Sequence, residues 1–403
     1  MKKKIIFAII LIMVIGLVGC DKKEQEPVQP GNDFAFKFLQ LENDTKNMVY
    51  SPLSIKYALS MLNEGADGKT KKEIEAVLKD LKLPKYESVD QNLSFANAVY
   101  IRDTYKQYVK EDFTNTLKEK YAAEVKFDAF ANAQNVNKFI EDKTLGIIKN
   151  MLKDEVVNNP DSEMILINAL AIDMEWENTF DFRNTTGRDF TLADGSKVSA
   201  TTMRQTEIRN DAIGFYKGDD VTALSMDLKK YGDVELEFMA VMPKGSLTEY
   251  VKTVKTEDID KIKGKLTLAS ATKGGLNITI PKFKFDYDLS LKADLKKLGI
   301  IEAFDKENAD FTKMTNNPRG LFVSEALHKA DIEFTEKGVK AAAVTVFIMY
   351  DKASIPLDEP EEVAIDSPFL YVIRDKANGE IWFVGTVYSP NLWENDKAEY
   401  MNK

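Results

Sequence analysis

Apolar and polar side chains alternate most regularly in residues 321–349, LFVSEALHKADIEFTEKGVKAAAVTVFIM. Leu321–Ala326 and Ile332–Phe334 carry the alternation and the β-forming side chains of a half-buried strand. Glu336-Lys337-Gly338 then predicts a hinge, because glycine tolerates backbone angles that other residues avoid. An exposed connecting loop does not require an uncharged face, but the segment after Gly338 has one. The pattern therefore predicts a strand that lies outside a sheet at first and can join it later. The uncharged alternate positions are Val339, Ala341, Ala343, Thr345, Phe347 and Met349.

The rest of the chain mixes two periodicities. Helical spacing of apolar positions occurs at 34–41, 53–62, 70–79, 113–124 and 135–152. Strand-like runs occur at 95–101, 163–173, 234–242, 276–285, 321–334, 369–374 and 380–388. Because the two types are interleaved and no repeat, linker or low-complexity break divides them, we expect one large α+β domain.

Six ordered blocks resemble the serpin family of serine protease inhibitors, after a first helix-like segment FAFKFLQLE at 34–42. The blocks are NMVYSPLSIKYALSMLNEGADGKTKKEI (47–74), ANAVYIRDTY (96–105), NKFIEDKTLGIIKNML (137–152), LINALAIDMEWENTFD (166–181), IPKFKFDYDLSLKADLKKLGIIEAFDKENADF (280–311) and SPFLYVIRDKANGEIWFVGTVYSP (367–390). The resemblance implies a single serpin-type α+β domain over 33–392, with three β-sheets and about nine helices. It also implies an exposed reactive loop near the C-terminus, at about 337–358, and a polar tail at 393–403.

In this family the hinge of the loop inserts into the main sheet after a protease has cut the bait bond. The matching hinge residues here are Glu336, Gly338, Val339, Ala341, Ala342, Ala343 and Thr345. The bait residue lies sixteen positions after the hinge glutamate, which predicts a cut between Lys352 and Ala353 and a trypsin-like target protease. Cleavage at Tyr350 or Met349 instead would suit chymotrypsin-, subtilisin- or elastase-like enzymes. Inhibitory members usually carry Thr or Ser at the position of Val339, but an inward apolar residue should be tolerated there.

The resemblance also implies two polar clusters in the sheet. Ser51, Ser54, Asn168 and His328 match the shutter, the cluster under the point where the main sheet opens. Trp176, Lys282 and Glu336 match the breach, where the loop first enters. The alternatives are a satisfied strand histidine at His328 and a solvated surface ion pair between Lys282 and Glu336.

The N-terminus predicts export and a lipid anchor. Lys2-Lys3-Lys4 and the apolar run Ile5–Val18 read as a signal peptide over residues 1–19, and Leu17–Cys20 resembles a bacterial lipobox. Cys20 is the only cysteine, so its thiol is the predicted acylation site and no disulfide is available. Residues 20–32 form a predicted tether. We therefore expect a bacterial envelope protein, on the outer membrane or cell surface rather than the inner membrane.

Composition argues against enzymatic and nucleic-acid functions. The single histidine, His328, has no G-x-S-x-G elbow to accompany it, and Gly68-Lys69-Thr70 fails as a phosphate loop because Asn63 replaces the required glycine. The formal net charge of -10 does not favour nucleic-acid binding. We expect a monomer without metal or cofactor whose partners are serine proteases. The alternatives are a non-inhibitory serpin-fold binding or storage protein and an unrelated ligand-binding lipoprotein.

Overall fold

The computed structural model describes residues 34–78, 83–89, 91–318, 320–339 and 358–390. In this part of the chain the α-helices are α1 Phe34–Leu41, α2 Pro52–Gly65, α3 Gly68–Leu78, α4 Glu111–Tyr121, α5 Gln134–Lys143, α6 Asp154–Val157, α7 Leu247–Thr253, α8 Thr256–Lys263 and α9 Leu291–Lys297. None of these described helices is long and apolar enough to cross a membrane. The best-capped of them, α2, begins where the Ser51 side chain accepts a hydrogen bond from the Ser54 amide and Pro52 takes the first turn.

Two sheets build one side of the molecule. The larger has the order β1-β18-β17-β10-β9-β8-β11, and its strands are β1 Met48–Tyr50, β18 Ile381–Val387, β17 Phe369–Asp375, β10 Leu236–Pro243, β9 Val221–Asp227, β8 Ile213–Lys217 and β11 Thr267–Leu268. The smaller has the order β16-β12-β7-β6, with β16 Glu361–Ala364, β12 Leu276–Pro281, β7 Lys197–Ile208 and β6 Thr186–Thr191.

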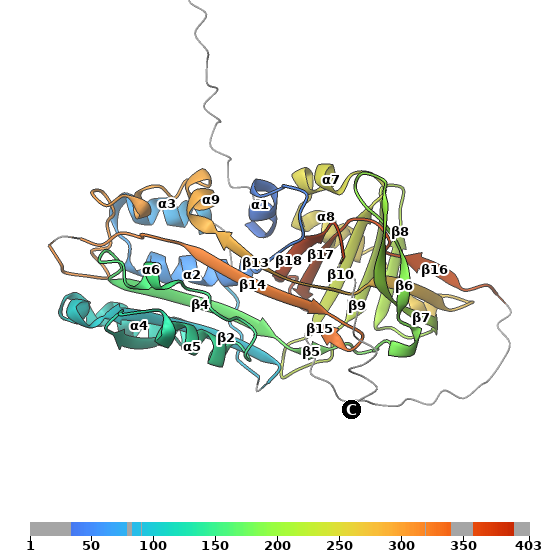
Figure 1. Ribbon diagram of the computed structural model, residues 1–403, viewed down its shortest axis with the longest axis horizontal. Coiled ribbons are helices and arrows are strands. Elements are labelled where there is room, and N and C mark those ends of the chain that lie inside the picture. The colour runs from blue at the N-terminus through green and yellow to red at the C-terminus, as the bar shows by residue number, and fades with distance from the viewer. Residues whose placement is uncertain (1–33, 79–82, 90, 319, 340–357, 391–403) are drawn as a thin grey trace, which may run out of the picture.

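The third layer is divided along most of its length. One part has the order β13-β14-β15-β5, with β13 Phe283–Ser290, β14 Leu327–Phe334, β15 Gly338–Val339 and β5 Met174–Glu175. The other has the order β3-β2-β4, with β3 Glu124–Asp128, β2 Leu93–Arg102 and β4 Met164–Ile172. Since only Asp173 separates β4 from β5, the two parts belong to one layer, and α2 is visible behind the space between β14 and β4 (Figure 1).

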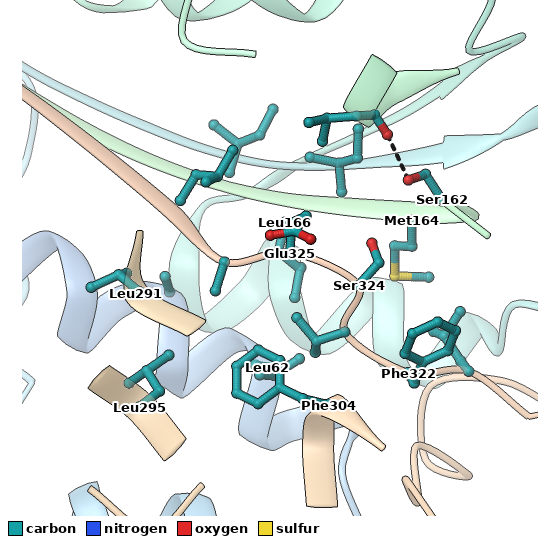
Figure 2. Close-up of a pocket in the computed structure, with 18 of the residues that line it drawn as sticks. Leu62, Ser162, Met164, Leu166, Leu291, Leu295, Phe304, Phe322, Ser324 and Glu325 are labelled. Atoms are coloured by element: carbon teal, nitrogen blue, oxygen red, sulfur yellow. Dashed lines mark hydrogen bonds between the residues drawn. The ribbon is translucent and has the colours of Figure 1, made fainter. Parts of the chain in front are cut away.

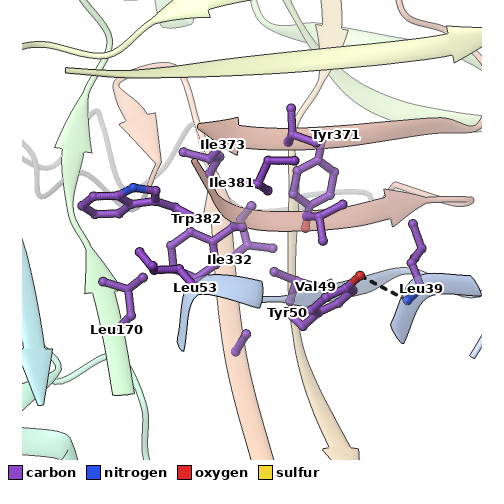
Figure 3. Close-up of a cluster of buried hydrophobic side chains, with 14 of the residues drawn as sticks. Leu39, Val49, Tyr50, Leu53, Leu170, Ile332, Tyr371, Ile373, Ile381 and Trp382 are labelled. Carbon is purple, nitrogen blue, oxygen red and sulfur yellow. Dashed lines mark hydrogen bonds between the residues drawn. The ribbon is translucent and has the colours of Figure 1, made fainter. Parts of the chain in front are cut away.

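A large apolar core joins this divided layer to the seven-stranded sheet. Figure 3 shows Leu53 of α2 among Leu170 of β4, Ile332 of β14, and Ile373 and Trp382 of the seven-stranded sheet. A smaller core fills the space under α5 on the opposite face of β4. Both faces of β4 are therefore covered, which explains why Ile167 to Ile172 form an unbroken buried run.

The structure confirms the predicted α+β class with three main sheets. It corrects three predicted boundaries. Helix α5 ends at Lys143 rather than 152, because Leu145 and Gly146 adopt positive φ values of 58° and 71°. The run 276–285 is two strands separated by Lys282. The run 321–334 becomes a strand only from Leu327, because the residues before it have no neighbouring strand to bond.

Candidate functional site

The hinge strand β15 already lies inside the divided layer. Phe334 of β14 pairs with Val339 on one side, and Glu175 and Met174 of β5 pair with Gly338 and Val339 on the other. Val339 is buried, with its neighbours Phe334 and Met174 in the same core. Among the described strands, only β15 pairs with both β14 and the β4–β5 side of the layer. The predicted hinge glycine, Gly338, and the first residue of the strand predicted to lie outside the sheet, Val339, are therefore already within it.

Gly338 fits this position because it lacks a side chain. A Cβ atom built on Gly338 would lie 2.0 Å from the carbonyl oxygen of Met174 and 2.8 Å from Cα of Glu175. Both obstacles are backbone atoms of the neighbouring strand, so they cannot swing away as a side chain would. Only glycine allows β15 to approach β5 so closely.

The predicted breach residues meet beside this hinge. Nζ of Lys282 lies 2.9 Å from Oε2 of Glu336, and both side chains are almost completely buried, with exposed fractions of 0% and 4%. Thr185 donates from its hydroxyl to Oε1 of Glu336 at 2.8 Å. The pair is therefore not a solvated surface pair. Because burial of one unpaired charge is costly, removing either partner should be strongly unfavourable.

Trp176 completes this end of the layer. Its indole Nε1 donates to the Thr335 carbonyl at 2.9 Å, and its backbone amide donates to the Lys337 carbonyl at 2.7 Å. Its ring packs edge-on against Phe334 at 5.1 Å between centroids. The polypeptide turn that leads into β15 is therefore held both through its backbone, by Trp176, and through the buried side chain of Glu336.

The predicted shutter residues meet at the N-terminus of α2, midway along the layer. Nε2 of His328 on β14 accepts a hydrogen bond from the Ser51 amide at 3.0 Å. The Ser54 hydroxyl makes a short hydrogen bond to the side-chain oxygen of Asn168 on β4. The two sides of the divided layer are thus tied to α2 at this level, and no described hydrogen bond joins β14 directly to β4.

Asn97 is a member of this cluster that the sequence analysis missed. Its side-chain oxygen accepts from Nδ2 of Asn168 at 2.5 Å, and its own Nδ2 donates to the Tyr121 carbonyl at 2.8 Å. Asn97 and Asn168 are paired across β2 and β4. An amide in the otherwise apolar run ANAVYI was the available signal, since a polar side chain inside a buried strand requires a partner.

Burial lowers the pKa of His328 to about 4, so the ring is neutral at physiological pH. A neutral ring is also required by the geometry, because a protonated Nε2 would point its hydrogen at the Ser51 amide.

An apolar cavity occupies the far end of the space between β4 and the segment 321–326. Its volume is about 160 Å³. Figure 2 shows Leu62 of α2, Leu166 of β4, Leu291 and Leu295 of α9, and Phe304 around it. The side chains around this space have fewer packing contacts than side chains of a filled core. The divided layer is therefore poorly packed at the end opposite the hinge.

The remaining predicted site residues lie outside the described part of the chain. They are the hinge positions Ala341, Ala342, Ala343 and Thr345, the bait positions Lys352, Ala353, Tyr350 and Met349, and the acylation site Cys20. No group of three His, Cys, Asp or Glu side chains among the described residues is arranged to hold a metal ion.

Comparison with known proteins agrees with this architecture. The family model described as "Serpin (serine protease inhibitor)" matches residues 29–390, so the chain belongs to the serpin family. It is 28% identical to an uncharacterized serpin-like protein of Methanosarcina acetivorans, covering 91% of this chain and 87% of the relative. It is 29% identical to glia-derived nexin of Rattus norvegicus, covering 86% and 88%. The native structure of the thermophilic serpin tengpin is similar, with a TM-score of 0.74, 27% identity and coverage of 89% and 92%. Members of this family are typically protease inhibitors rather than enzymes.

We predict that Gly338→Ala destabilises the uncut protein by about 1–3 kcal/mol, because the added methyl overlaps the Met174 carbonyl unless β15 leaves the sheet. Thermal unfolding followed by circular dichroism measures the effect. Gly245→Ala is the matched control, since its Cβ meets nothing within 4 Å. Identical melting of Gly338→Ala and wild type would mean that β15 is not held between β14 and β5.

We also predict that His328 makes stability depend on pH. Because its folded pKa of about 4 lies below the ordinary 6.5, its contribution is complete above pH 6.5 and is lost as the pH falls toward 4. The difference corresponds to about 3 kcal/mol. His328→Gln keeps an acceptor for the Ser51 amide but does not titrate, so its melting temperature should fall less than that of wild type between these pH values. Parallel pH profiles for the two proteins would contradict the assignment.

Proposed function

We propose that this serpin inhibits trypsin-like serine proteases irreversibly, as a suicide substrate that acts once. The protease cuts the bond between Lys352 and Ala353 and forms an acyl-enzyme. The freed loop then inserts between β14 and β4, carrying the tethered protease with it. The observation that carries the proposal is the position of β15. Its two residues would be the first residues of the inserted strand, and their pairing with β14 and β5 would set its register on both sides.

The two registers support insertion over the whole length of the loop. Continued residue by residue, they would bring Thr345 level with both His328 and Asn168, the shutter residues of the two flanking strands. They would bring Lys352 level with Leu321 and Asp161, at the far end of the layer. The distance from Val339 to Lys352 as a strand is about 45 Å. The predicted bait therefore lies as far from the hinge as the space between the strands extends.

The faces of the layer support the same proposal. Val339 points into the core, so the alternate positions Ala341, Ala343 and Thr345 would follow it there. Lys340 would instead lie on the outer face, level with the carboxylates Glu333 and Asp173 on either side. A cation between two carboxylates is favourable in a sheet.

Insertion has an apolar driving force. It would bury the six alternate apolar and small side chains, worth on the order of 5–10 kcal/mol. It would also fill the cavity at the far end and supply backbone partners to β4 and β14. The uncut molecule is then maintained by a kinetic barrier rather than by being the most stable state.

Lys352 favours trypsin-like targets because these enzymes accept a basic residue before the scissile bond. Cutting after Tyr350 or Met349 would instead direct the inhibitor toward chymotrypsin-, subtilisin- or elastase-like proteases. The position of the cut therefore decides the target class.

We predict that mixing the protein with trypsin gives a covalent complex of the summed mass on a denaturing gel. Mass spectrometry of the released C-terminal fragment should show Ala353 as its first residue. Nicking should also raise the melting temperature, since the inserted strand completes the layer. Lys352→Ala should lose the complex with trypsin.

Ala341→Arg separates inhibition from simple cleavage, because its charge would have to enter the core. This variant should be cut at the same bond without trapping trypsin. Cleavage of the wild-type protein without any complex would instead favour a non-inhibitory serpin that serves in binding or storage.

We further propose that the protein is a lipoprotein, acylated at Cys20 after removal of residues 1–19 and held on the bacterial envelope. The support is the sequence pattern of a charged start, an apolar run and a small residue before the cysteine. Cys20→Ser should shift the protein from the membrane fraction to the soluble fraction and abolish incorporation of labelled palmitate. Continued labelling of Cys20→Ser would exclude this attachment site.

A further inference from the structure

The turn that precedes β4 is held by one side chain. Arg102, the last residue of β2, donates from Nε and Nη2 to the Ser162 carbonyl at 3.1 and 2.9 Å, and from Nη2 to the Asn159 carbonyl at 2.8 Å. It also approaches the carbonyls of Val157 and Ala129 at 3.4 Å. Its side chain is 16% exposed, and Nε lies 3.4 Å from Oε2 of Glu163. One guanidinium therefore fixes the turn 158–162 against the end of β2.

This turn forms part of the wall of the apolar cavity. Asp161, Ser162 and Glu163 line the cavity together with Met164 at the start of β4. The turn is closed by hydrogen bonds from the Ser162 amide to the Asn159 carbonyl and from the Glu163 amide to the Asp161 carbonyl. The Ser162 hydroxyl adds a bond to the Val156 carbonyl at 2.6 Å (Figure 2). Residues 161–163 are consequently bent and do not extend β4.

The Ser162 carbonyl points to the wrong side for an extended strand. The Arg102 amide donates to the Glu163 carbonyl at 2.9 Å, so that carbonyl faces β2. Successive carbonyls of a strand face opposite sides, so an extended Ser162 would direct its carbonyl into the space between β4 and β14. It is instead turned toward the Arg102 guanidinium. Arg102 therefore occupies the acceptor that a strand inserted at this level requires.

We propose that Arg102 is a positioning residue that slows the last stage of loop insertion, where the bait end of the strand reaches residues 161–163. For full insertion the turn has to straighten. The Ser162 carbonyl then has to lose its hydrogen bonds from the Arg102 guanidinium and accept one from the inserted strand. The inference rests on the proposed inhibitory function. The contacts of Arg102 with the turn 158–162 would be present in the uncut molecule and lost in the fully inserted molecule.

The test follows the movement of trypsin by stopped-flow fluorescence. The protein carries Cys20→Ser and an acceptor dye on Lys118→Cys, an exposed position of α4, and trypsin carries the donor. We expect Arg102→Met to speed the approach of the dyes by about two- to tenfold, the range by which one net hydrogen bond alters a rate. Arg102→Lys keeps the charge but loses the planar fork of five N–H donors, so its rate should fall between those of Arg102→Met and wild type. Arg209→Met, which removes one exposed bond to the Lys273 carbonyl, is the control and should leave the rate unchanged.

Melting temperatures distinguish positioning from simple stabilisation. Arg102→Met should lower the melting temperature of the uncut protein and leave that of the nicked protein unchanged. An equal decrease in both forms with an unaltered insertion rate, or a slower rate, would overturn the proposal. Absence of trapping by the wild-type protein would instead overturn the proposed inhibitory function itself.

Discussion

The structure depends on two strand edges that face one another and are bonded at one end only. β14 and β4 belong to the same layer, yet among the described strands only β15, Gly338–Val339, pairs with both of its sides. Unpaired strand edges normally invite another strand, because backbone amides and carbonyls require partners. Here α2 lies behind the opening, and the Ser51 amide and the Ser54 hydroxyl donate hydrogen bonds to His328 of β14 and Asn168 of β4. The two sides of the layer are thereby held through α2 rather than by direct pairing of β14 with β4.

The same constraint explains the distribution of buried polar groups. The buried ion pair of Lys282 with Glu336 lies at the hinge, and the cluster of His328, Asn168 and Asn97 lies midway. The end of the layer opposite the hinge instead has the apolar cavity and the turn 158–162 that the Arg102 side chain holds. The bonded end is therefore well packed, whereas the opposite end keeps empty volume. In the proposed mechanism, a strand that enters from the hinge would reach this less filled end last.

Much of the candidate site could be predicted from the sequence. The hinge residues Gly338 and Val339, the polar residues of SPLS and LINA, and Glu336 with Lys282 all marked positions that the structure brings together at the divided layer. Asn97 was missed because a single amide in an apolar strand does not reveal which residue it contacts. Arg102 was missed because its partners are backbone carbonyls, which leave no trace in residue types. Strands β6 to β9 and helices α7 to α9 were not predicted, since they are short or have mixed polarity.

By itself the sequence determined the α+β class, the positions of the hydrophobic strands and the family, because periodicity and ordered motifs are local properties. Tertiary structure alone decided where strands end. Leu321–Ala326 has the pattern of a strand but is not one, because a strand requires a bonded neighbour and no described strand lies beside it. Gly338–Val339 has a neighbour on each side and is a strand. Pairing is a property of two segments, so no single segment can encode it.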